Sequence, residues 1–375
     1  MLAVIVPYYQ NQLNLNFHQF LVAVSAFALM LVIWDLPTGW LADQWGRKRS
    51  LIMGAATYGL GFVALLYSSG FYSAIAAECV IGIGVALMNG AHTALLYDSL
   101  LAAGREHEFR RFEGFRFALG LYMCAFSSVV GGYLYVLSPR LPLALESIMA
   151  AIGAGVAILF VEPPRHKRIV EKHPIKDMWD TIKYVTHGHK EIGGLIALMV
   201  LTFATTKLCM WALQAYSKEM GLPESYNGWI ISATMLLSAL FGHFSHKIFP
   251  RAQGRHVLYG LLCVLIGAMM VAGWSIAWLG IACLMLEAFV FGFGMPRAQD
   301  AINKLAESSR RATILSTASL AGSLGFVPLS QVMGWGADHF GIGPALMLHA
   351  AILALCGAGA FVMTQRAHRE RATKA

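Results

Sequence analysis

Charged residues are scarce in this chain of 375 residues. Asp, Glu, Lys and Arg together make up 13% of it, and hydrophobic residues make up 57%. Soluble globular domains carry roughly a quarter charged residues, and the mean hydropathy here is +0.60. The apolar runs recur at about the 20-residue length that crosses a bilayer. The sequence therefore predicts an all-α protein that crosses the membrane many times.

The usual marks of catalysis and metal binding are missing as well. The 6 cysteines lie singly within apolar runs, with no CxxC pair, which is typical of small buried side chains rather than of disulfides or a metal site. No phosphate-binding loop, HExxH motif or serine–histidine–acid spacing stands out. We therefore predict no enzyme, no metal and no cofactor. No cleavable signal peptide is visible, which suits a chain whose first spans direct insertion.

The distribution of positive charge sets the predicted orientation. The formal net charge is +8, which alone would permit a nucleic-acid partner. The basic residues, however, concentrate in alternate segments between apolar runs, and the opposite loops hold only Arg140 and Lys218. Lys and Arg distributed in this way mark cytoplasmic loops. We therefore predict a bilayer protein with no nucleic-acid partner, its mid-chain linker and C-terminus in the cytoplasm.

The apolar runs predict eleven complete spans. They cover residues 17–40, 50–69, 71–99, 115–137, 141–161, 191–216, 226–249, 257–274, 277–297, 312–333 and 344–364. Met1 to Tyr9 is apolar but too short to cross a bilayer, and it is interpreted as the remnant of a first span, through truncation or a misplaced start. With this remnant counted as span 1, the eleven complete spans are numbered 2 to 12.

This count gives a division into four parts. We expect an N-terminal bundle over 1–161, a cytoplasmic linker over 162–190, a C-terminal bundle over 191–365 and a cytoplasmic tail over 366–375. Within the linker, apolar residues recur at helical spacing between Ile175 and Val185, with charged residues on the other face. This pattern predicts an amphipathic helix along the inner membrane surface.

The most informative stretch is 35–51, DLPTGWLADQWGRKRSL. Its charged residues and glycines are Asp35, Gly39, Asp43, Gly46, Arg47, Lys48 and Arg49. Such dense charge cannot lie in hydrocarbon, so we predict a short cytoplasmic turn between two spans. Glycines at both ends would let the two helices approach closely. A polar hairpin that is basic without further meaning is the alternative interpretation.

This stretch resembles the loop signature between the second and third spans of the major facilitator superfamily. The preceding Asp35-Leu-Pro-Thr resembles a segment of bacterial drug-exporter-like members. The resemblance implies two six-helix bundles that work by alternating access. It also implies that Asp98, after Ala94-Leu-Leu-Tyr, pairs with Arg47, and that Asp43 faces the start of span 11, holding the halves closed on the cytoplasmic side. An N-cap for the next helix is the alternative role for Asp98.

Two further patterns bear on this resemblance. Residues 334–341, GWGADHFG, echo 39–46, GWLADQWG, without the arginines that follow the first copy. Inverted repeats are a feature of secondary transporters, although chance gives such an echo too. Span 5, however, has Ser127-Ser-Val-Val-Gly-Gly where drug–proton antiporters of the family carry Gly-Pro-x-x-Gly-Gly. This departure argues against export by antiport.

Three charged side chains fall deep within predicted spans: Glu78, Lys207 and Glu287. Each lies roughly 10 to 16 Å below the outer end of its helix, so the three share a depth. The resemblance implies that their helices line a central cavity. We hypothesise that one acid pairs with Lys207 while the other carries a proton. The alternative is a snorkelling lysine and two packed, hydrogen-bonded acids.

Trp211 and Gln214 lie on nearly one face of the predicted span 7. They are candidates for binding an amphipathic ligand, and equally for a place in the aromatic belt at the membrane interface.

Together these features predict a monomeric secondary transporter in a bacterial inner membrane. It would move a small molecule by alternating access, coupled to protons, with efflux of amphipathic compounds as one direction. A non-transporting membrane sensor on the same scaffold is the alternative. A sensor should tolerate loss of the cavity carboxylates but need the linker or tail for a partner.

Overall fold

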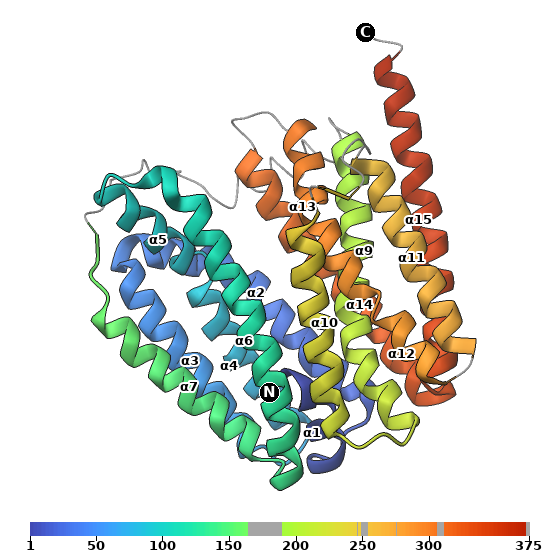
Figure 1. Ribbon diagram of the computed structural model, residues 1–375, viewed down its shortest axis with the longest axis horizontal. Helices are drawn as coiled ribbons and strands as arrows, with labels where there is room; N and C mark the ends of the chain where they lie inside the picture. The colour runs from blue at the N-terminus through green and yellow to red at the C-terminus, as the bar shows by residue number, and fades with distance from the viewer. Residues whose placement is uncertain (164–189, 246, 249–253, 275, 306–310, 373–375) are drawn as a thin grey trace. The chain divides into compact units, whose positions relative to one another are not determined.

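The computed structural model describes residues 1–163, 190–245, 247–248, 254–274, 276–305 and 311–372, and the regular elements in these ranges are all helices (Figure 1). The chain divides into two compact units, Met1–Lys172 and His173–Ala375. The boundary falls inside the predicted linker. The amphipathic helix predicted between Ile175 and Val185 lies outside the described residues.

The first unit begins with two short helical elements, which include the residues interpreted as the remnant of a span. Its elements are η1 (Leu2–Val4), α1 (Ile5–Gln12), α2 (Phe17–Trp45), α3 (Arg47–Leu66), α4 (Phe71–Met88), α5 (Ala91–Ala102), η2 (Glu106–Glu108), α6 (Phe109–Leu137) and α7 (Leu141–Leu159). Those of the second unit are α9 (Lys190–Glu219), α10 (Ser225–His243), α11 (Gly254–Trp274), α12 (Trp278–Leu284), α13 (Glu287–Leu305), α14 (Arg311–Phe340) and α15 (Ile342–Ala372).

Nine stretches of the described chain are long and apolar enough to cross a membrane. They match nine of the eleven predicted spans. The other two predicted spans, 226–249 and 312–333, form helices α10 and α14. Helix α15 continues beyond the last predicted span into the predicted tail, to Ala372.

Two predicted spans are broken, which corrects their description as single helices. Span 4 divides into α4 and α5 at Asn89 and Gly90, where Gly90 has φ +73°. This left-handed backbone is readily adopted by glycine, which has no Cβ to clash. Span 10 divides into α12 and α13 around Met285 and Leu286. The second break lies among apolar residues, which give no sign of it, whereas the first lies at an Asn-Gly pair, a turn signal within a long apolar run.

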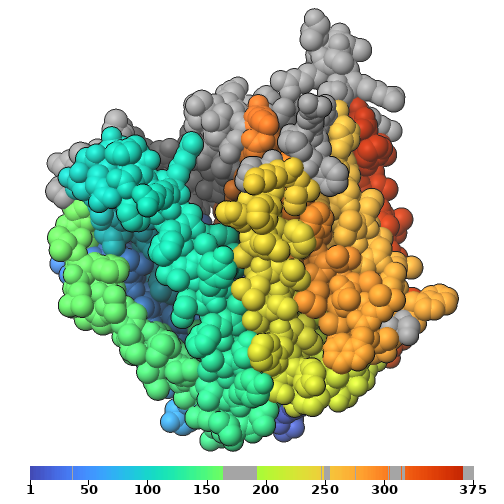
Figure 2. All heavy atoms as spheres, viewed as in Figure 1, coloured from blue at the N-terminus to red at the C-terminus, as the bar shows by residue number. Residues whose placement is uncertain are grey.

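Helix packing within each unit relies on small residues at close contacts. A Cβ at Gly84 of α4 would clash with the backbone of Tyr58 on α3, and one at Gly292 of α13 would clash with Ser238 on α10. By contrast, α6 and α7 carry long rows of exposed apolar side chains, part of which lie on the face shown in Figure 2. Apolar side chains exposed in this way on spanning helices suit contact with lipid rather than water.

Candidate functional site

The charged stretch at the end of α2 is more helical than its composition suggested. Helix α2 runs through Asp35, Gly39 and Asp43 to Trp45, so the predicted turn over 35–51 is wrong except at Gly46. Thr38 donates a side-chain hydrogen bond to the Ala86 carbonyl of α4, at 3.0 Å, which packs this part of the helix. Charge excludes a segment from hydrocarbon but not from a helix, and a helix end that projects beyond the bilayer satisfies both conditions.

A single residue, Gly46, connects α2 to α3. Its φ of +113° and ψ of +147° lie in a region that favours glycine. Its N–H donates to the Ala42 carbonyl at 3.1 Å, and its carbonyl accepts from the N–H of Ser50 at 3.1 Å. The last turn of α2 and the first turn of α3 therefore meet at one backbone position.

Arg47, the first residue of α3, makes the ion pair that the resemblance implied. Its Nε lies 2.8 Å from Oδ2 of Asp98 on α5, and its guanidinium is 3.7 Å from Asp43, four residues earlier. The Arg47 and Asp98 side chains are half-buried, with 22% and 23% exposed. Asp98 lies within α5, so it is not an N-cap. The contact of Asp43 with the start of span 11 would join the two units and stays a prediction.

Glu162, which is not among the predicted site residues, completes this cluster. Its carboxylate accepts hydrogen bonds from the backbone N–H groups of Arg47, at 2.9 Å, and Lys48, at 2.8 Å. The first N–H groups of a helix lack partners within the helix, and the helix dipole favours an anion there. An acid just beyond the apolar run of span 6, on the side of the basic turn, was the available signal.

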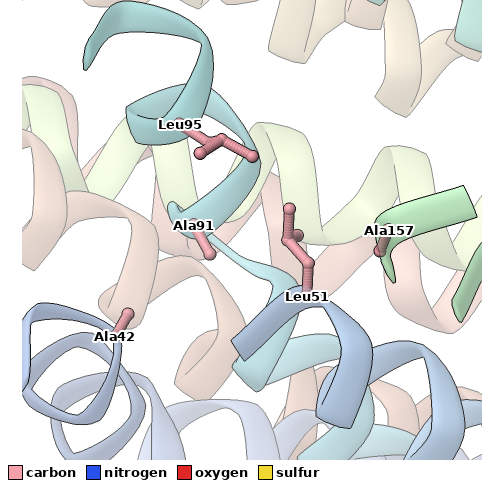
Figure 3. Packing of buried hydrophobic residues seen from close by; sticks show 5 residues of the cluster. All are labelled: Ala42, Leu51, Ala91, Leu95 and Ala157. Atoms are coloured by element: carbon pink, nitrogen blue, oxygen red, sulfur yellow. The ribbon is translucent and has the colours of Figure 1, made fainter. Parts of the chain in front are cut away.

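An apolar cluster lies beside these polar contacts. Small and aliphatic side chains from four helices meet in it: Ala42, Leu51, Ala91, Leu95 and Ala157 (Figure 3). Packing of α2, α3, α5 and α7 through this cluster brings the nearby charged residues together. We name Gly46, Arg47, Asp98 and Glu162 the inner clasp.

The inner clasp gives a first prediction about stability. Replacing Glu162 with Ala should lower the unfolding temperature by roughly 2–4 °C, because loss of a helix cap costs about 1 kcal/mol. Thermal unfolding of the purified protein in detergent measures this. Glu106→Ala, which removes an exposed acid from η2, is the control and should leave the temperature unchanged. An equal shift in both variants would contradict the capping role.

The two acids within the spans have different surroundings. Glu78 of α4 is 7% exposed, and its Oε1 accepts a hydrogen bond from the hydroxyl of Tyr9, at 2.8 Å. Glu287, the first residue of α13, is 5% exposed, and its Oε1 has no hydrogen-bond partner in the described part of the chain. Leaving a buried polar atom unpaired costs about 1–3 kcal/mol. Of the two acids, Glu287 is therefore the one with a buried oxygen that could accept a further hydrogen bond or a proton.

Lys207 lies over an aromatic ring of the same unit. Its Nζ lies 4.7 Å from the centre of the Phe326 ring on α14, a cation–π contact within the second unit. The predicted pairing of Lys207 with one of the two acids stays a prediction. Trp211 and Gln214 are both buried, with 7% and 1% exposed.

These features define a class of protein: a polytopic, all-helical membrane protein with buried carboxyl groups and broken spans, the construction of a secondary transporter. A family model described as Major Facilitator Superfamily matches residues 1–330. The chain therefore belongs to this superfamily of transporters. No group of three or more His, Cys, Asp or Glu side chains suited to a metal occurs in the described ranges.

Individual relatives agree with the family. The arabinose–proton symporter of Escherichia coli (strain K12) is 38% identical over 80 residues, which are 21% of this chain and 16% of the symporter. Among solved structures, a mutant of the nucleoside transporter NupG is similar with a TM-score of 0.76 and 13% identity, over 96% of this chain and 94% of that one. A D-xylose–proton symporter gives 0.72 and 16%, over 96% and 93%. At these identities the structures support the fold alone.

Proposed function

We propose that this protein is a proton-coupled secondary transporter of a small polar molecule in a bacterial inner membrane. The observation that carries the proposal is Glu287, a buried carboxyl group at the break between α12 and α13 with one oxygen that has no hydrogen-bond partner among the described residues. Charged groups within spans are costly and typically mark ion or proton pathways. Discontinuous helices at such points are typical of transporter binding sites.

Proton loading and release at Glu287 would accompany the change of access. A proton that binds there removes a charge from the apolar interior, and its release restores that charge. The neutral side chain therefore favours an apolar environment, and the charged side chain favours a hydrated one. Glu78, which already accepts a hydrogen bond from Tyr9, is the second candidate. In the first unit, the inner clasp fixes the α2–α3 turn, and we propose that it stabilises the state closed toward the cytoplasm.

Uptake with protons is favoured over drug efflux. The relatives reported above are named as symporters of sugars and as a nucleoside transporter. The span 5 segment Ser127–Gly132 also departs from the antiporter pattern. We therefore expect a hydroxyl-bearing small molecule, such as a sugar or nucleoside, to be the substrate.

Transport in liposomes tests this function. The purified protein is reconstituted, an inward-acid or outward-acid pH gradient is imposed, and labelled pentoses, hexoses, nucleosides and amphipathic cations are screened. We expect one of the first three classes to accumulate when the outside is acidic, and a protonophore to abolish the accumulation. Protein-free liposomes are the control. If no compound of the panel accumulates under either pH gradient, the non-transporting sensor is favoured.

A further inference from the structure

The sequence echo between 39–46 and 334–341 has a counterpart in the backbone. Helix α14 ends at Phe340 and α15 begins at Ile342, so Gly341 alone joins them, as Gly46 alone joins α2 to α3. Gly341 has φ +86°. Its N–H donates to the Ala337 carbonyl at 3.0 Å and its carbonyl accepts from Ala345 at 3.3 Å, which repeats the two bonds of Gly46.

The second turn also has a carboxylate at the following helix. Oε2 of Glu219, the last residue of α9, accepts a hydrogen bond from the N–H of Ile342 at 3.1 Å. A Cβ at Gly341 would lie 3.3 Å from Oε1 of Glu219, so the carboxylate rests directly against the glycine. Glu162 occupies the equivalent place at the N-terminus of α3. Ile342 stands where Arg47 stands in the first copy, so this contact uses the backbone without an arginine pair.

Further contacts join α9 to α15 away from this end. Thr205 Oγ1 lies 3.3 Å from Nε2 of the fully buried His349. Near the start of α9, Gly194 is in such close contact with Thr364 that a Cβ would clash with its side chain. The two helices, drawn in light green and red in Figure 1, are thus in contact at both ends and between them.

We propose that Glu219 is a positioning residue that locks the α14–α15 turn to the end of α9, so that α9 and α15 move as one body. Glu219 does this because a single carboxylate, fixed to α9 by the chain, supplies the acceptor that the first turn of α15 lacks. Helix α9 carries Lys207, Trp211 and Gln214, so the lock sets the position of these side chains during transport. Only that last step rests on the proposed function.

Hydrogen exchange of the full-length protein in lipid nanodiscs tests the lock without any substrate. In Glu219→Ala, amides in the first turn of α15 should exchange roughly 5- to 30-fold faster, the range expected when a capping interaction is lost. Exchange should also rise in the second half of α9, around Lys207 to Gln214. A simple cap would change α15 alone, and that outcome, like no change at all, would overturn the proposal.

Matched variants separate the lock from general damage. Glu219→Gln keeps one acceptor oxygen and should restore most of the protection at both sites. Gly341→Ala should have a smaller effect in the same direction, because its Cβ would lie 3.3 Å from the carboxylate, which must shift, and its positive φ strains the turn. Gly104→Ala is the control for backbone strain. It places a Cβ at another position with positive φ (+68°) where no atom lies within 4 Å, and it should leave exchange in α9 and α15 unchanged. If Gly104→Ala loosens α9 equally, the effect is general destabilisation and the proposal fails.

Discussion

Reversing the charge of Arg47 or Asp98 alone is expected to reduce the rate of transport by about tenfold or more. Reversing both charges together should restore part of the transport activity. Each single reversal places two like charges where Nε and Oδ2 now lie 2.8 Å apart. Breaking a partly buried ion pair and replacing it by repulsion costs roughly 2–5 kcal/mol, and about 1.4 kcal/mol corresponds to a factor of ten. The initial rate of uptake in liposomes, with expression held equal, measures the effect in Arg47→Asp, Asp98→Arg and the double variant.

An exposed ion pair provides the matched control. Arg105 and Glu108 are 2.7 Å apart, but half of the Arg105 side chain is exposed, and exposed pairs contribute about 0–1 kcal/mol. Reversing Arg105, Glu108 or both should therefore change transport by less than about fivefold. Single variants of Arg47 and Asp98 with wild-type activity would remove the inner clasp from the transport cycle.

Part of the inner clasp could be predicted from the sequence, and part could not. The Arg47–Asp98 contact was predicted because both residues lie in short patterns that a family shares, and the structure has it. Glu162 was missed because its partners are backbone N–H groups, which leave no signature in the side chains of the residues that donate them. The same reason hid the Glu219–Ile342 contact, although the glycine pattern around it was visible.

Helix continuity was less predictable than helix location. Apolar composition indicated where the chain is buried in lipid, and nine predicted spans match stretches of the structure. The interruption at Gly90 was not predicted because the span was assigned from its apolar composition, although the Asn89-Gly90 pair is a turn signal and Gly90 has a positive φ. Conversely, the charged end of α2 was predicted as a turn, because dense charge was taken to mark the end of the helix. It marks only the end of the segment that lies in the membrane.

The surroundings of the buried charges depend on side-chain packing, which no single sequence pattern specifies. The position of the Lys207 cation over the Phe326 ring was not predictable, because the two residues are on different helices, α9 and α14. The hydrogen bond from Tyr9 to Glu78 connects residues 69 positions apart. Depth along a helix was readable from the sequence, whereas the partner across the helix interface was not.

Replacing Glu287 with Gln should abolish accumulation of substrate against its gradient and remove the pH dependence of transport. Gln keeps the shape and hydrogen-bonding size of the side chain but cannot gain or lose a proton. Energy-independent exchange of labelled for unlabelled substrate should persist, because it needs the change of access without net proton movement. The two assays, run on the same liposomes at acidic and at neutral pH, therefore separate loss of coupling from loss of folding.

Glu78→Gln provides the internal comparison, because Glu78 is an equally buried acid that already holds a hydrogen bond. If Glu287 alone carries the proton, Glu78→Gln should shift the pH dependence without abolishing it, since the Tyr9 hydroxyl can still donate to the amide oxygen. If both single variants remain coupled, the double variant decides between the roles of the two acids. Full pH-dependent accumulation in Glu78→Gln/Glu287→Gln would show that neither acid couples protons to transport. The unpartnered oxygen of Glu287 would then require a structural explanation, such as a bound water in the break between α12 and α13.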